Sequence, residues 1–363
     1  MTNRLRLYTP KLTRSLKGRL WGNRWHKILS IIVVILLIIT GIMYGTSRWY
    51  AWDTRSQPLT YGVSFIPTYA RSLGVDPQQT MDALLKIGVK QFRLVSYWNE
   101  IEPAQGQYDF STLDWQFKKA EAAQAHIILT VGLRQPRWPE CHVPSWVDTT
   151  KQLQYWQPQL ETYMQAVVAR YKDSPALEKY QLENEYFLKG FGDCTDFSRT
   201  RLVSEYSAVK KVDSIHPIIV GRSNNALGFP VGKPTPDQFS ISVYKRVWDA
   251  GVTHRYLEYP FPAWFYGYIA GVQKIYTGKD MSIAELQAEA WPPNGKNIVD
   301  TSLTEQNKSL DARRLKERFA YGKATGMKSV DLWGAEYWYY RQQILHDNSL
   351  WDVAQQEFVA SNR

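Results

Sequence analysis

Short apolar segments recur along most of the chain and alternate with longer segments whose apolar residues have helical spacing. This alternation constrains the fold more than any other feature, because parallel strands must be joined by crossovers that usually contain a helix. The segments predicted as strands are residues 61–65, 91–96, 126–131, 179–184, 217–221, 239–244, 281–285 and 329–333. The clearest helices are predicted over residues 77–86, 111–124, 152–171 and 310–324.

Eight such units over about 295 residues predict a (β/α)8 barrel, the TIM barrel, within residues 59–363. An open doubly wound sheet is the alternative α/β fold, and it commonly carries a glycine-rich phosphate-binding loop. The sequence contains neither G-x-G-x-x-G nor G-x-x-x-x-G-K-[ST], and it has no H-E-x-x-H motif or paired C-x-x-C. We therefore expect no nucleotide cofactor and no metal.

An uncharged run of 17 residues, 28–44, precedes the barrel. Its length is close to the lower limit for a helix that spans a bilayer. Aromatic residues flank it, as at membrane interfaces: Trp21, Trp25, Trp49, Tyr50 and Trp52. We predict a single transmembrane signal anchor over residues 28–45. A cleaved signal peptide is the alternative, although the basic region and the apolar run are long and no A-x-A-like site follows. A buried core helix is disfavoured because the run has no polar face.

The formal net charge of +10 would by itself suggest an acidic partner such as nucleic acid. Residues 1–27, however, contain eight basic and no acidic residues, and the rest of the chain carries 36 basic and 34 acidic ones. The distribution of charge therefore predicts the orientation of the chain in the membrane, with residues 1–27 as a cytoplasmic tail and the barrel outside the cytoplasm. Residues 46–58 are polar and are predicted to be a linker. We expect the lipid bilayer as a partner, and no nucleic acid.

Carboxylates stand near the ends of two predicted strands. Glu185 follows the fourth strand, Glu285 ends the seventh, and Glu289 lies four residues further on. Functional groups of a barrel enzyme gather at the carboxyl ends of its strands, and these two ends can face each other across the mouth. Hydrolysis of a glycosidic bond uses two such carboxyl groups, one as an acid and the other as a nucleophile or base.

Several ordered motifs resemble the glycoside hydrolases of clan A, which include families 5 and 42. Around the second strand the matching residues are Phe92-Arg93-Leu94, Trp98, Ile101-Glu102-Pro103, Gly106, Tyr108-Asp109-Phe110 and Leu113-Asp114. Asn184-Glu185 is similar to the clan's Asn-Glu pair, and Glu285 resembles its nucleophile. The resemblance implies a retaining mechanism, with Glu185 as acid/base and Glu285 as nucleophile, and no cofactor. Glu289 stays open as an alternative nucleophile.

The same resemblance implies roles for further residues in binding the substrate. Asn184 would bind the sugar 2-hydroxyl, Arg93 would keep the nucleophile ionised, and Tyr244 would donate a hydrogen bond to it. Trp333 resembles the aromatic platform of the cleavage subsite. Ion pairing within the protein alone is the alternative role for Arg93, and a purely structural role is the alternative for Tyr244.

Trp98 and Glu336 are also predicted to contact substrate, with packing in the barrel as the alternative for Trp98 and a surface salt bridge as the alternative for Glu336. The aromatic segment 256–268 is expected mainly to pack, and its alternatives are a cleft wall or a membrane contact. The sequence departs from family 5 because Gly-Leu-Arg at 132–134 and Ser-Val-Tyr at 242–244 replace that family's histidine motifs. These departures leave the sugar open.

Two cysteines, Cys141 and Cys194, fall in the loops after the third and fourth predicted strands. Outside the cytoplasm they are expected to form a disulfide that clamps the loop behind Glu185, with two free buried thiols as the alternative. We therefore expect a membrane-anchored extracytoplasmic glycoside hydrolase that cleaves β-glycosidic bonds in oligo- or polysaccharides. The alternatives are a non-catalytic carbohydrate-binding barrel and a transglycosylase that uses the same residues.

Overall fold

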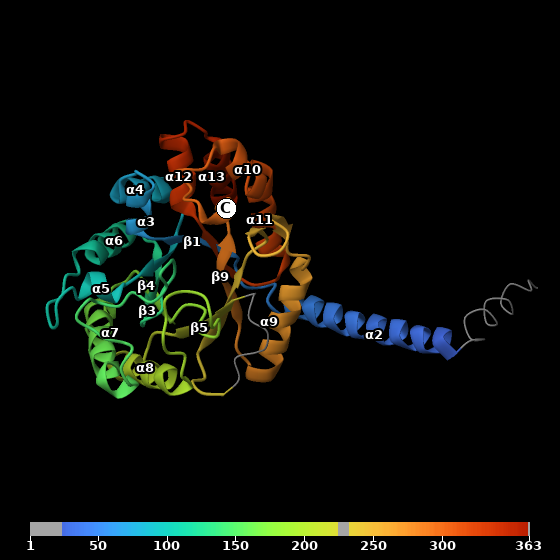
Figure 1. Ribbon diagram of the computed structural model, residues 1–363, viewed down its shortest axis with the longest axis horizontal. Helices are drawn as coiled ribbons and strands as arrows, with labels where there is room; N and C mark the ends of the chain where they lie inside the picture. The colour runs from blue at the N-terminus through green and yellow to red at the C-terminus, as the bar shows by residue number, and fades with distance from the viewer. Residues whose placement is uncertain (1–23, 224–231, 362–363) are drawn as a thin grey trace, which may run out of the picture.

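The computed structural model describes residues 24–223 and 232–361. Within them, eight parallel strands close into a barrel in the order β1-β10-β9-β6-β5-β4-β3-β2, which confirms the predicted TIM barrel (Figure 1). The strands are β1 Thr60–Phe65, β2 Gln91–Val95, β3 His126–Val131, β4 Leu177–Leu182, β5 Ile218–Ser223, β6 Gln238–Val243, β9 Met281–Gln287 and β10 Ser329–Trp333. Every predicted strand is present, with ends that differ by a few residues at most.

Helices surround the barrel (Figure 1). The longer ones are α4 Pro77–Lys86, α6 Ser111–Ala122, α7 Gln157–Tyr171, α8 Arg199–Val212, α9 Ala263–Thr277, α11 Ala312–Ala324 and α13 Ser349–Ser361. The shorter ones are α3 Pro67–Ser72, α5 Trp98–Ile101, α10 Leu303–Ser309, α12 Ala335–Gln343 and the single turns η1 Leu153–Tyr155 and η2 Pro293–Gly295. Residues 232–237, the described part of the connection from β5 to β6, contain no helix.

Local capping explains where the predicted helices begin. α4 has the predicted bounds because the Asp76 carboxylate accepts a hydrogen bond from the Gln79 N–H and Pro77 occupies the first helical position. The helix predicted over 310–324 begins two residues later, because Asp311 caps it by accepting from the Arg314 N–H.

The barrel strands are buried along nearly their whole length, as expected for a parallel sheet covered by helices. Their common direction places all eight carboxyl ends at one mouth. After β6 the chain forms an antiparallel hairpin, β7 Arg246–Asp249 and β8 Arg255–Glu258, that the sequence did not indicate. The aromatic segment 256–268 is therefore divided between this hairpin, a short connection and α9.

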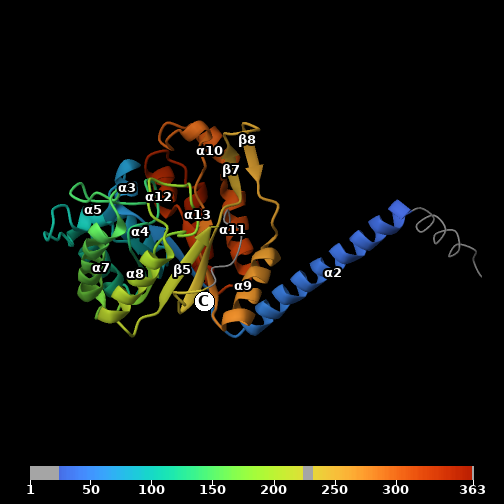
Figure 2. The same cartoon turned by 60° about the horizontal axis from the view of Figure 1, so that its bottom comes forward.

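One long helix, α2 Arg24–Asp53, projects from the barrel (Figure 2). The side chains of its apolar part are mostly exposed, and its length and composition suffice to cross a membrane. The linker predicted over 46–58 differs in the structure, because residues 46–53 continue the helix and pack on α9. Residues 1–23 of the predicted basic tail lie outside the described residues.

Candidate active site

A cavity of about 690 Å³ opens at the mouth of the barrel. Four of the carboxylates that line it come from the connections after β3 and β4, from β9 and from the residues that follow β9. They are Glu140, Glu185, Glu285 and Glu289. Its aromatic lining includes Tyr244, Trp291 and Trp333. The structure therefore brings most of the predicted site residues together in one cavity.

Glu285 lies within β9 and is 2% exposed. Its Oε1 atom accepts a hydrogen bond of 2.8 Å from Nη1 of Arg93, and its Oε2 atom accepts one of 2.6 Å from the hydroxyl of Tyr244. Arg93 comes from β2, and Tyr244 directly follows β6. The two bonds hold both carboxylate oxygens, so the orientation of Glu285 is fixed before any substrate binds.

The guanidinium of Arg93 connects four strands or strand ends at the base of the cavity. Besides Glu285, it donates to Gln181 Oε1 at 2.7 Å, to Asn184 Oδ1 at 2.8 Å and to Ser64 Oγ at 3.2 Å. Arg93 is 1% exposed, so these acceptors compensate a charge that has lost its water. The planar fork of donors suits this task, and a lysine would reach fewer partners.

Glu185 lies in the turn after β4 and is 6% exposed. Burial, and next the negative charge of Glu285, raise the pKa of Glu185 to about 7, while the hydroxyls of Ser242 and Ser223 oppose the shift. Its Oε1 atom has no hydrogen-bond partner among the described residues. A buried carboxyl with a free oxygen and a pKa near neutrality suits a general acid.

The turn that carries Glu185 has a strained backbone. Glu183 and Glu185 have φ values of 58° and 43°, in the left-handed region that residues with a side chain rarely adopt. The Glu183 carboxylate stabilises the turn by accepting from the N–H groups of Leu133 and Arg134 and by pairing with Arg201. A Cβ at Gly132 would lie 2.4 Å from Glu183 Oε1, so only glycine fits there.

Glu140 is a further carboxyl in the cavity that the sequence did not indicate. Its Oε2 atom accepts from Asn184 Nδ2 at 3.1 Å and lies 3.4 Å from Nε of Arg134. Burial raises the pKa of Glu140 to about 8 although Arg134 opposes the shift, and the charges of Glu285 and Glu185 add to it. The sequence signal available was its position beside Cys141, in a loop at the carboxyl end of a strand.

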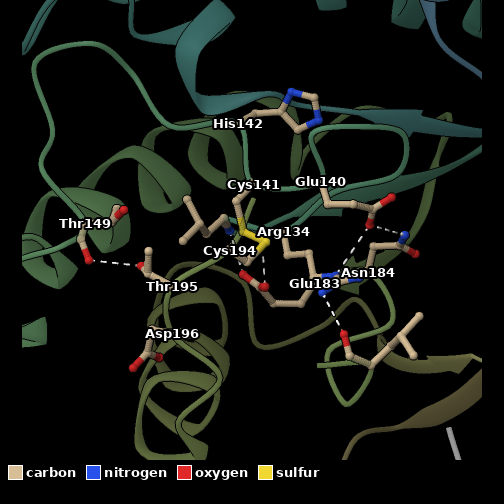
Figure 3. The surroundings of a disulfide bond; sticks show 12 residues. Arg134, Glu140, Cys141, His142, Thr149, Glu183, Asn184, Cys194, Thr195 and Asp196 are labelled. Carbon is tan, nitrogen blue, oxygen red and sulfur yellow. Dashed lines mark hydrogen bonds and ion pairs between the residues drawn. A yellow bond between two sulfur atoms is a disulfide. The ribbon is translucent and has the colours of Figure 1, made fainter. Parts of the chain in front are cut away.

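The predicted disulfide is present and joins Cys141 to Cys194 (Figure 3). It ties the loop that carries Glu140 to the loop after Glu185. The two loops also touch directly, because the Asp193 N–H donates to the Pro139 carbonyl at 2.9 Å. A Cβ at Gly192 would lie 2.7 Å from the Glu140 Cβ, which shows how closely they approach.

Glu289 has different partners from Glu285. It pairs with Arg137 at 3.1 Å and accepts from Trp333 Nε1 at 2.9 Å. The Arg137 guanidinium also lies over the Trp333 ring, 4.5 Å from its centroid. Glu289 thus positions Trp333 and Arg137.

Three residues predicted to take part in substrate binding do not line the cavity: Arg93, which contacts Glu285, and Trp98 and Glu336. Trp98 is fully buried, stacks on Tyr163 and donates through Nε1 to Glu102. Glu336 is 1% exposed and accepts from the Ile66 N–H, so it is neither a surface salt bridge nor part of the lining. Burial raises its pKa to about 7, an effect that Arg137 opposes. Within the described ranges, no group of three or more His, Cys, Asp or Glu residues could hold a metal ion.

Part of the chain is similar to a known protein family. Residues 76–214 match a family model described as glycoside hydrolase 42, β-galactosidase. That stretch includes Arg93 and the Asn184-Glu185 pair. No curated protein sequence matches the chain.

Solved structures of glycoside hydrolases share the fold at low sequence identity. An exo-β-1,4-mannosidase from Opitutaceae bacterium strain TAV5 matches with a TM-score of 0.55 and 12% identity, over 84% of this chain and 60% of that one. A β-galactosidase from Halorubrum lacusprofundi matches with a TM-score of 0.51 and 12% identity, over 83% of this chain and 58% of that one. Xylanase 10B from Thermotoga petrophila RKU-1 matches with a TM-score of 0.54 and 12% identity, over 86% of this chain and 97% of that one. The chain thus spans only about 60% of the length of the first two enzymes.

In its barrel and over residues 76–214, the chain is thus similar to the glycoside hydrolases of the clan A class. Within that class, the family that its sequence matches is family 42, the β-galactosidases, over less than half of the chain.

Proposed function

We propose that the protein is a membrane-anchored glycosidase that cleaves β-glycosidic bonds outside the cytoplasm with retention of configuration. One observation carries the proposal: Glu285 is oriented by Arg93 and Tyr244, and Glu185 lies in the same cavity with a pKa raised to about 7. One carboxylate is thus held by a cation, and the other retains its proton near neutral pH. These are the two states that a retaining mechanism requires.

In the first step, Glu285 attacks the anomeric carbon while Glu185 protonates the departing oxygen. The charge of Glu285 is lost when it becomes an ester. Because that charge is one cause of the raised pKa of Glu185, the pKa of Glu185 then falls and its carboxylate becomes a better base. In the second step, Glu185 removes a proton from water, which attacks the glycosyl-enzyme and releases Glu285.

The contacts of the two candidates favour Glu285 over Glu289 as the nucleophile. Arg93 and Tyr244 supply a positive charge and a hydrogen-bond donor to Glu285, whereas Glu289 is engaged with Arg137 and Trp333. We assign Glu289 to positioning the Trp333 platform. Asn184 would present its amide to the sugar, with its orientation fixed by Arg93 and Glu140.

A β-galactoside is the first substrate to test, because the matched family model is described as β-galactosidase. The cavity suits a saccharide, since aromatic faces bind sugar C–H surfaces and the carboxylates accept hydroxyl hydrogen bonds. A non-catalytic carbohydrate-binding barrel would not need an acid and an oriented nucleophile in one cavity. A transglycosylase would use the same residues and differ only in the acceptor.

The membrane anchor rests on α2. Its apolar stretch is exposed, and the basic residues lie on its N-terminal side. Beyond that stretch, Tyr50 and Thr54 are 1% and 0% exposed against the barrel. The end of the helix is therefore part of the folded protein, which supports a retained anchor over a cleaved signal peptide.

The test is turnover of aryl β-galactosides, β-glucosides and β-mannosides by the full chain in detergent, with Glu285→Gln and Glu289→Gln as matched variants. We expect loss of kcat on the order of 10⁴-fold or more for Glu285→Gln and a far smaller loss for Glu289→Gln. NMR of the first-formed anomer checks retention. Full activity of Glu285→Gln would refute the assignment, and absence of turnover on every glycoside would favour the binding protein.

A further inference from the structure

The direction of α2 relative to the barrel is set by its contacts with α9. The ring of Tyr44 packs edge-on against Trp264, near the start of α9, with centroids 5.8 Å apart. Nine residues further along α2, Asp53 pairs with Lys274, near the end of α9, at 2.7 Å. The two helices therefore run parallel where they touch, and Figure 2 shows them side by side.

α9 starts on the mouth side of the barrel and ends on the opposite side, because it connects the carboxyl end of β6 to the amino end of β9. The end of α2 reaches that opposite side. Tyr50 donates from its hydroxyl to the carbonyl of Met281, the first residue of β9, and Thr54 donates to the carbonyl of Gly326, before β10. The apolar part of α2, which precedes Tyr44, therefore leaves the protein on the side where the cavity opens.

No flexible segment separates the apolar part of α2 from the barrel. A Cβ at Gly267 would lie 2.5 Å from Ser47 Oγ, and one at Gly271 would lie 2.9 Å from a methyl carbon of Thr46. These glycines let the helix backbones approach closely, as small residues do between packed helices. Together with the buried Tyr50, the contacts fix the barrel to the helix over several turns.

The hairpin β7–β8 lies between the cavity and the start of α9. Leu257 and Glu258 of the hairpin line the cavity, and so do Tyr259 and Pro260, which lead into α9. The hairpin also carries exposed apolar side chains: Val252 at its turn is 86% exposed, and Leu257 is 45% exposed. The wall of the cavity on the anchor side thus exposes apolar side chains, together with the charged Arg255 and Glu258, on the face from which the apolar helix leaves.

We propose that the catalytic mouth faces the outer surface of the membrane, with the β7–β8 hairpin against it, and that the substrates are saccharide headgroups of lipids in that membrane. This inference rests on the proposed function, both for the anchor and for glycoside hydrolysis. A rigid, linker-free anchor keeps the cavity at the level of lipid headgroups. Saccharides that lie further from the bilayer are out of reach, because only a flexible tether would let the cavity move to them.

The orientation is tested with the full chain in vesicles of phosphatidylcholine and phosphatidylglycerol. A fluorophore is attached to Val252→Cys or, as the control, to Ile215→Cys between α8 and β5 on the opposite face. Both native side chains are 86% exposed, and the native cysteines are paired in the disulfide. With headgroup-labelled quencher lipids, we expect strong quenching at position 252 and little at 215. Equal quenching, or stronger quenching at 215, would overturn the orientation.

A flexible glycine and serine insertion after Gly45 is the matched variant, because it separates the membrane span from the packed end of α2. It should reduce the difference in quenching between the two positions while the barrel stays folded. An unchanged difference would overturn the claim that the rigid α2–α9 contact sets the orientation.

The substrate class is tested in the same vesicles with a glycolipid that carries a β-galactosyl headgroup, the free headgroup oligosaccharide and an aryl β-galactoside. We expect cleavage of the glycolipid at least about tenfold faster than that of the free oligosaccharide at equal bulk concentration, and a smaller ratio for the insertion variant. Turnover of the aryl glycoside without preference for the glycolipid would refute the proposal that lipid headgroups are the substrates. It would leave the proposed function in place. No turnover of any of the three would refute the proposed function and this inference with it.

Discussion

Nη1 of Arg93 lies 2.8 Å from Oε1 of Glu285, and both side chains are almost completely buried. The pair joins β2 to β9 across the interior of the barrel. A buried ion pair adds little net stability by itself, but removing one partner leaves a charge without compensation. The relationship therefore ties the stability of the barrel to the charge state of the proposed nucleophile.

Replacing Arg93 with Met is expected to lower kcat strongly and to destabilise the fold by about 3 kcal/mol, because Glu285 loses its cation and Asn184 loses a donor. Arg93→Lys keeps the charge and should recover part of both losses. Steady-state kinetics below the unfolding temperature and thermal unfolding followed by circular dichroism measure the two effects. Wild-type kcat in Arg93→Met would contradict the role given to this residue.

The rate of glycosylation should depend on the protonation of Glu185. Since the acid form is needed and its pKa is about 7, kcat/KM for a glycoside with a poor leaving group should fall as pH rises through about 7. Glu185→Gln with a dinitrophenyl glycoside, whose leaving group needs no proton, should lack this alkaline limb. If the limb persists in that variant, another group causes it.

Glu140 is expected to position Asn184 in its neutral form, because its pKa is raised to about 8. Glu140→Gln preserves the shape of the neutral carboxyl and should keep most activity at about pH 6, whereas Glu140→Ala should raise KM and lower kcat. Comparison of KM and kcat for the two variants separates positioning from a proton-transfer role. Equal losses in both variants would indicate that the carboxylate itself is required.

The buried carboxyls with raised pKa values include Glu140, Glu185, Glu336 and Asp331, the last with a pKa of about 6. A raised folded-state pKa means that the native protein retains protons that the unfolded chain releases. Their stabilising contribution is full below the ordinary carboxyl pKa and is lost as pH rises through about 6 to 8. Thermal unfolding midpoints should therefore fall over this window, and Glu336→Gln should flatten the curve. A midpoint that rises over the same window would contradict the assignment.

The Cys141–Cys194 disulfide closes a loop with a sequence separation of 53 residues. Replacing both cysteines with Ser should destabilise the protein by up to about 4 kcal/mol through the greater entropy of the unfolded chain. Activity should also fall below the unfolding temperature, since the loop carrying Glu140 loses its clamp. Denaturant unfolding and kinetics at the same temperature distinguish the two effects. Unchanged kinetics would show that the direct contacts between Gly192 and Glu140 are sufficient to hold the loop.

The sequence by itself predicted the barrel, because hydrophobic periodicity is a local property and each strand, such as β3 or β10, carries its own signal. It also placed Glu185 and Glu285 at one mouth, since parallel strands bring their carboxyl ends together. The disulfide followed from the same topology, because the loops after neighbouring strands lie side by side. These inferences needed only the order of the elements along the chain.

Only the tertiary structure distinguished the surroundings of Glu285 from those of Glu289, because Arg93 and Tyr244 reach Glu285 from other strands. Burial of Trp98 and Glu336 depends on side chains distant in sequence, as does the contact between Glu140 and Asn184. From the sequence, residues 46–53 were predicted to be a polar linker. The glycines on which this end of α2 packs, Gly267 and Gly271, lie more than two hundred residues away in the chain. Local pattern determines which elements form, whereas complementarity between distant surfaces decides how they meet.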